Sequence, residues 1–265
     1  MRIKRLTTAL LAIVAVSASL PAAAAPEWDL LGVKLGMTEA EVRAAFQAYD
    51  PKAKVTAMNA ALWYSDGLNN HKTEPFLDEL QIELVRVARF QPLRVWFSGP
   101  EGEPRVIAIA RQEMNTPNPP TQAQLIQALT TKYGEPADQL ASGSNSNPVW
   151  KEPGKPSCVQ ARYSPDRLHL GGFPQIVTGQ MNLWKVVNTF VGGAERELHN
   201  PPADLGQCGA VMYYTLGPDP VSTFNAGLFD LGALAATAKS RQELVERLSA
   251  EARAKREGQG QVPQL

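Results

Sequence analysis

The residue types that most often carry chemistry are scarce or poorly spaced in this chain. The three histidines, His71, His169 and His199, all lie in segments that we expect to be loops. None stands four residues from another histidine, and no H-E-x-x-H sequence is present. The spacing that puts two zinc ligands on one helix face is therefore missing, and we predict no metal site.

Signatures of nucleophilic catalysis are also missing. No serine sits in G-x-S-x-G, and neither S-x-x-K nor K-T-G occurs. The adjacent carboxylates Asp78 and Glu79 are unspecific, and we expect Glu79 at the solvated edge of a strand. There is no Walker or dinucleotide-binding glycine pattern, so we expect no cofactor. The sequence predicts no catalytic residues and a protein that is not an enzyme.

Cys158 and Cys208 are the two cysteines of the chain. They do not form C-x-x-C, so a redox motif has little support. In an oxidising compartment, two cysteines far apart in sequence predict one disulfide, which restricts the unfolded chain by about 4 kcal/mol in the loop-entropy model. The alternatives are two free thiols or a redox switch.

Aromatic side chains are the remaining candidates for a binding site. The candidates are Trp63, Tyr64, Trp96, Trp150 and Trp184. Neighbouring strand residues point to opposite faces, so only one of Trp63 and Tyr64 can lie in the core. A second aromatic face of the sheet would bind a peptide, a glycan or a partner protein. The alternative that we favour is that the C-terminal helix and an insertion cover that face.

The first 24 residues are typical of a cleaved signal peptide. The chain starts with basic residues at Arg2 to Arg5, continues with an apolar run at Leu10 to Val16, and then has small residues at Ala22 to Ala25. The apolar run is too short to cross about 30 Å of hydrocarbon, so we expect no transmembrane segment in the mature chain. An uncleaved anchor is the alternative. We predict a periplasmic or secreted protein.

The charge of the mature chain argues against nucleic acid as a partner. The full chain has 26 basic and 26 acidic residues, and removing three basic ones with the signal leaves a net charge of −3. A mildly acidic surface does not attract phosphates. The basic run Arg253 to Arg256 is flanked by Glu251 and Glu257, as on the solvated face of a helix.

Three capping boxes predict three helix starts, at Thr38 with Glu41, Thr121 with Gln124 and Ser240 with Glu243. Between the helices, apolar and polar residues alternate, which predicts short antiparallel strands. The predicted strands include Val55 to Tyr64, Leu80 to Leu84, Leu93 to Phe97, Arg105 to Arg111, Ala210 to Leu216 and Val221 to Phe229. We therefore predict an α+β fold, with an antiparallel sheet, helices packed on one face and one disulfide.

We expect residues 25–256 to form a single α+β domain. If it consists of two lobes, the polar stretch 139–148 is the boundary, because its composition is that of a loop or linker. Residues 164–207 have no clear periodicity and are interpreted as an insertion. The tail, residues 257–265, is expected to be disordered.

The run G-V-K-L-G-M-T-E-A-E-V, within Asp29 to Phe46, resembles the G-M-T-x-x-x-V opening of small bacterial envelope modules. These are the outer-membrane assembly lipoproteins of the SmpA/OmlA type and the β-lactamase-inhibitor-protein-like repeats. The resemblance implies a strand end, a turn and a first helix packed on an antiparallel sheet, in a module that binds other proteins. This chain lacks the lipid-attachment cysteine of the lipoproteins.

The sequence therefore favours an exported, non-catalytic envelope protein that binds another envelope protein. One alternative is a periplasmic carrier or sensor of a small ligand or glycan, held in a cleft between the insertion and the sheet. The second alternative is an enzyme without a recognisable motif, since a catalytic triad is defined by geometry rather than by sequence.

The disulfide prediction can be tested by thiol labelling of the denatured periplasmic protein. We expect labelling of Cys158 and Cys208 only after reduction, because the bridge consumes both thiols. Equal labelling with and without reductant would show that the bridge is absent.

Overall fold

The computed structural model describes residues 27–84, 93–114, 116–142, 145–155, 159–160, 168–169, 183–184 and 207–258. The predicted signal peptide, Cys158, His199 and residues 259–265 of the predicted tail lie outside these residues, as does most of the predicted insertion. Within the described ranges, no helix has both the length and the apolar character needed to cross a membrane.

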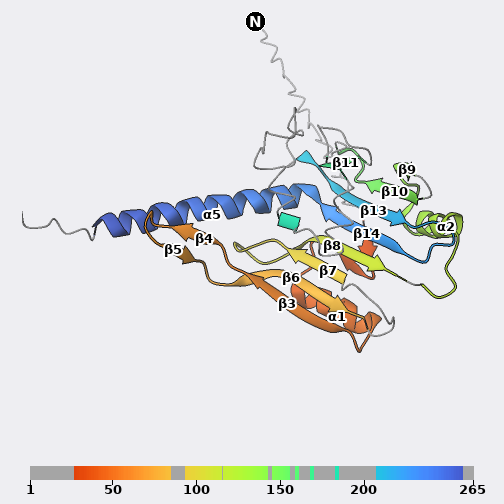
Figure 1. Ribbon diagram of the computed structural model, residues 1–265, viewed down its shortest axis with the longest axis horizontal. Coiled ribbons are helices and arrows are strands. Elements are labelled where there is room, and N and C mark those ends of the chain that lie inside the picture. The colour runs from red at the N-terminus through yellow and green to blue at the C-terminus, as the bar shows by residue number, and fades with distance from the viewer. Residues whose placement is uncertain are drawn as a thin grey trace, which may run out of the picture.

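An eight-stranded antiparallel sheet forms the centre of the molecule (Figure 1). From edge to edge its strands are β3 (Lys54–Ala60), β6 (Phe76–Glu83), β7 (Leu93–Phe97), β8 (Val106–Glu113), β14 (Phe224–Asp230), β13 (Ala210–Leu216), β10 (Asn145–Lys151) and β9 (Asp138–Ser142). The predicted antiparallel sheet is confirmed. The stretch 139–148 is not a linker: it forms most of the β9–β10 hairpin, and strands from both halves of the chain share one sheet.

Three helices and three small two-stranded sheets complete the described fold. The helices are α1 (Glu39–Tyr49), α2 (Gln122–Tyr133) and α5 (Leu231–Gly258). The small sheets pair β1 (Asp29–Leu30) with β2 (Val33–Lys34), β4 (Trp63–Ser65) with β5 (Asn70–Lys72), and β11 (Val159–Gln160) with β12 (Leu168–His169). His71 and His169 thus lie in short strands, not in the loops that we expected.

The first two helices begin where the capping boxes predict. Thr38 accepts a hydrogen bond from the Glu41 backbone N–H, and the Glu41 carboxylate accepts one from the Thr38 N–H at 2.7 Å. Thr121 and Gln124 make the same reciprocal pair at the start of α2. Local hydrogen-bonding chemistry therefore fixes both helix starts.

The predicted helix start at Ser240 is wrong. α5 begins nine residues earlier, at Leu231, where the Asp230 carboxylate accepts a hydrogen bond from the Ala233 N–H at 2.8 Å. Ser240 lies inside the helix. A capping pair inside a helix cannot act as its start. The buried residues between Leu231 and Leu244 hold α5 against the sheet.

The two halves of the chain repeat one arrangement. Among the strands of the eight-stranded sheet, β3, β6, β7 and β8 follow α1 in the chain, and β9, β10, β13 and β14 follow α2. The halves meet where β8 pairs with β14. Val42 and Phe46 follow Thr38 at the same spacing at which Leu125 and Leu129 follow Thr121, and all four pack into one core cluster.

Helices cover both faces of the sheet, so the expectation of helices on one face is wrong. α1 and α2 pack on one face, together with residues such as Leu80 and Met212. The first half of α5 packs on the other face, against residues such as Trp96 and Phe229. The sequence of β8 is consistent with this, because its first five residues are all buried, as in strands covered on both sides.

The cap of α1 can be tested by Thr38→Ala. We expect it to lower the free energy of unfolding by about 1 kcal/mol, because one N–H of the first turn loses its acceptor. Thr131→Ala is the control: Thr131 is an exposed residue within α2, where alanine is a better helix former. We expect no loss of stability in Thr131→Ala, and a Thr38→Ala variant as resistant to urea as the wild type would show that the cap does not stabilise the protein.

Candidate interaction surface

The two halves of α5 differ in their surroundings. The first half is buried against the sheet at Leu231, Leu234 and Leu244, among others. Residues 245–258, all of them described, include none that is buried, and they project beyond the sheet (Figure 1). The β4–β5 hairpin lies against this projecting half. We call residues 63–72 together with residues 245–258 the arm.

Arg241 fixes the direction of α5 relative to the sheet. The residue is 9% exposed, its Nε donates to the Gly99 carbonyl at 2.8 Å, and its Nη2 donates to Asp78 at 2.7 Å. The guanidinium lies 3.7 Å from the centroid of the Trp184 ring, and the Trp184 Nε1 also donates to Asp78. Burial lowers the pKa of Arg241, and the negative charge of Asp78 acts in the opposite direction.

A β-bulge gives Asp78 its position. The register between β3 and β6 shifts at Met58 and Asn59, so that Asp78 has no partner on β3. The next residue, Glu79, is 6% exposed and binds Arg94 through two hydrogen bonds of 2.6 and 2.7 Å. Our expectation of a solvated Glu79 is therefore wrong. Each carboxylate binds an arginine: Asp78 holds α5 against the sheet, and Glu79 links β6 to its neighbour β7.

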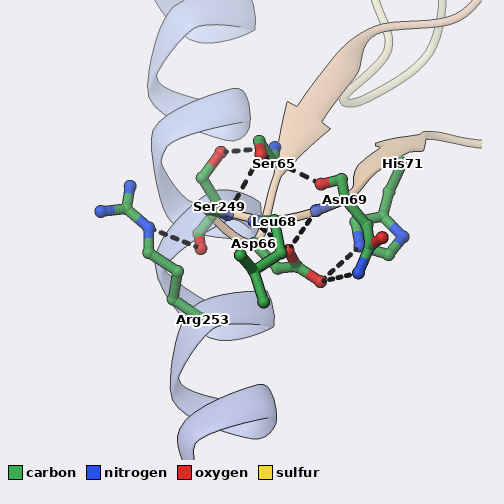
Figure 2. A network of polar contacts seen from close by, with 8 residues as sticks. Ser65, Asp66, Leu68, Asn69, His71, Ser249 and Arg253 are labelled. Atoms are coloured by element: carbon green, nitrogen blue, oxygen red, sulfur yellow. Dashed lines mark hydrogen bonds and ion pairs between the residues drawn. The ribbon is translucent and has the colours of Figure 1, made fainter.

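Asp66 closes the tip of the arm's hairpin (Figure 2). The residue is 6% exposed, and its carboxylate accepts hydrogen bonds from the backbone N–H groups of Leu68 and Asn69, at 2.8 and 2.7 Å. The Nε2 of His71 lies 3.1 Å from the same carboxylate. The Asn69 and Leu68 N–H groups, followed by His71, hold the pKa of Asp66 well below its ordinary value. This charged Asp66 determines the shape of the turn.

The hairpin tip also contacts α5 directly. The Ser65 N–H donates to the Ser249 hydroxyl at 3.3 Å (Figure 2). Gly67 has a φ of +92°, and a Cβ atom at this position would lie 3.1 Å from Arg256 Nη1 and close to Arg253. Glycine therefore allows the turn both its left-handed backbone and its close approach to the helix.

The arm presents two large apolar side chains to solvent. Leu68 is 78% exposed and Trp63 is 59% exposed. Trp63 and Tyr64 have different partners across the hairpin, as expected for opposite faces: Lys72 lies 4.2 Å from the Trp63 ring centroid, and His71 stacks on Tyr64 at 5.3 Å. Leu68 was not predicted from the sequence, although an isolated leucine in the turn S-D-G-L-N-N is the available signal.

The other aromatic candidates do not join this surface. Trp96 and Trp150 are each 2% exposed, and the Trp150 Nε1 donates to the Gly134 carbonyl at 2.8 Å. Trp184 is partly buried and packs against the cluster that covers the first half of α5. The five predicted residues therefore do not form one aromatic surface. Trp96 lies in the same core cluster as Leu231 and Leu234 of α5, so the first half of this helix covers the sheet at that position.

The described residues contain no group of three or more His, Cys, Asp or Glu side chains arranged to hold a metal ion. A shallow groove of about 590 Å³ runs along α2, between Pro120 and Thr131, and its side chains are mostly polar. None of the five aromatic candidates lines it. It is not the apolar cavity with converging polar groups that would favour a carrier.

Comparisons with protein-family models, with curated proteins and with solved structures found no match to this chain.

The role of Asp66 gives a pH-dependent prediction. Its pKa is lower in the folded protein than the value of about 3.9 in an unfolded chain, so its charge stabilises the fold above pH 4 or so. That contribution is lost progressively as the pH falls towards the folded-state pKa. We expect Asp66→Asn to melt at a lower temperature than the wild type at neutral pH.

The difference between the two melting temperatures should shrink steadily below about pH 4, because there the Asp66 carboxylate takes up a proton in the unfolded wild type while it stays charged in the folded one. Glu135→Gln is the control, since Glu135 is exposed just after α2 and lies far along the sequence from the arm. A difference for Asp66→Asn that does not change with pH would contradict the role of this charge.

Proposed function

We propose that this is an exported, non-catalytic envelope protein that binds another protein through the arm. The observation that carries the proposal is the exposure of Trp63 and Leu68 on a hairpin whose conformation is fixed by Asp66. Both side chains leave apolar surface in water, which costs free energy that a binding partner would recover.

The internal order of the arm supports a role in binding. A flexible loop loses conformational entropy when it binds, whereas a loop that already has its bound shape avoids much of that cost. The hydrogen bonds to Asp66 and the contact of Ser65 with Ser249 hold the turn in the free protein. Tryptophan is also one of the residue types that contribute most to binding energy at protein interfaces.

The resemblance at the N-terminus is in keeping with this proposal. Asp29 to Phe46 form the short β1–β2 hairpin and most of α1, and α1 packs on an antiparallel sheet. The envelope modules that this segment resembles have the same local arrangement and bind proteins. Export to the periplasm and a disulfide between Cys158 and Cys208 belong to the same proposal; Cys208 is 4% exposed.

The proposal can be tested by photo-crosslinking in the cell. A photoreactive residue at Leu68 should give an adduct of defined mass with one partner protein. The matched control is a photoreactive residue at Gln127, which is exposed on α2, far from the arm in sequence. Both variants should melt like the wild type, because neither side chain is part of the core.

A second variant then tests the contribution of Trp63. With the crosslinker at Leu68, Trp63→Ser should reduce the adduct about tenfold or more, as expected for the loss of an aromatic anchor. If the adduct also forms from Gln127, or persists unchanged with Trp63→Ser, the arm is not the binding surface.

A further inference from the structure

β3 forms one edge of the eight-stranded sheet and pairs, among the described strands, with β6 alone. Five of its seven residues are exposed, and Val55 and Ala60 are partly buried. Alternate N–H and C=O groups of an antiparallel edge strand point away from its partner. No backbone hydrogen bond joins β3 to another described segment outside the sheet.

This edge has few of the features that usually prevent strand pairing. Charged residues, prolines and bulges in the edge strand itself are the common means of protection. β3, K-V-T-A-M-N-A, has one charge, at Lys54, and no proline. The bulge at this edge adds its extra residue, Asp78, to β6, so the pairing of β3 is not interrupted by a residue of its own.

We propose that β3 pairs antiparallel with β3 of a second copy of this chain, about a two-fold axis at Ala57. In this register Val55 faces Asn59 of the other copy, Thr56 faces Met58, and Lys54 faces Ala60. The two lysines lie at opposite ends of the paired strands, so no like charges oppose each other.

Exposed apolar side chains flank this edge. Met58 on β3 is 44% exposed, and Tyr49, at the end of α1 just before β3, is 41% exposed. Pairing of the strands brings Met58 against Thr56 of the second copy and removes part of its surface from water. A single pair of short strands is a small interface compared with the roughly 1,200–2,000 Å² of stable complexes, so the dimer depends on concentration.

This inference is independent of the proposed function, which rests on Trp63 and Leu68 rather than on β3. Disulfide trapping tests it, using the full mature protein in non-reducing gels. In the Ala57→Cys variant, the introduced cysteine of one chain lies directly opposite the introduced cysteine of the second chain at the two-fold axis. The Cα–Cα distance of residues that face each other in this way suits a disulfide, so we expect a crosslinked dimer.

Lys54→Cys is the matched control, since the two Lys54 positions lie at opposite ends of the strand pair and are too far apart for a disulfide. The wild type controls for crosslinks through Cys158 or Cys208. Crosslinking of Ala57→Cys no greater than that of Lys54→Cys would overturn the proposal.

Sedimentation measurements provide a second test without cysteines. The wild type should form dimers as its concentration rises, and Ala57→Asp should weaken dimerisation at least tenfold, because two carboxylates would meet at the two-fold axis. Ala123→Asp, an exposed alanine in the first turn of α2, should dimerise like the wild type. A wild type that stays monomeric at every soluble concentration, or equal dimerisation of both variants, would overturn the proposal.

Discussion

The buried ion pair between Arg241 and Asp78 is the interaction on which the arm depends. An arginine this far from water is stable only if its charge and its N–H groups find partners. Asp78, the Gly99 carbonyl and the Trp184 ring supply them. Because these contacts fix one turn of α5 against the sheet, the remaining turns of this straight helix project in a defined direction. The hairpin needs only a few contacts to complete the arm.

Much of the fold could be predicted because its signals are local. The capping boxes at Thr38 and Thr121 each depend on residues three apart, and the strand at Ala210 to Leu216 was predicted from its apolar run. Such signals survive in any tertiary context that leaves the segment intact. They say where an element begins, and they do not say which element lies beside it.

The predictions that were wrong depended on tertiary contacts. The polar residues of the β9–β10 hairpin have the composition of a linker. They form strands because β10 pairs with β13, which lies about 60 residues further along the chain and is not part of the local pattern. Asp78 and Glu79 look like ordinary surface acids, because the arginines that bind them are brought close only by the fold: Arg94 across the β6–β7 pair, and Arg241 from α5, 163 residues along the chain. The start of α5 was missed because Ser240 offers a stronger local pattern than Asp230. The exposed Leu68 was missed because one leucine in a polar turn is a weak signal, and its exposure depends on what the rest of the chain leaves uncovered.

The two proposed surfaces are neighbours in the chain, and their geometry makes them compatible. β3 ends at Ala60, and the hairpin strand β4 begins at Trp63. In an antiparallel pair of β3 strands, the two C-terminal ends point in opposite directions, and seven residues span roughly 24 Å. The two arms would therefore leave the paired edge at opposite ends, each with Trp63 and Leu68 accessible. A dimer of this kind would present two binding surfaces, and a partner with two matching sites would bind it more tightly than either surface alone.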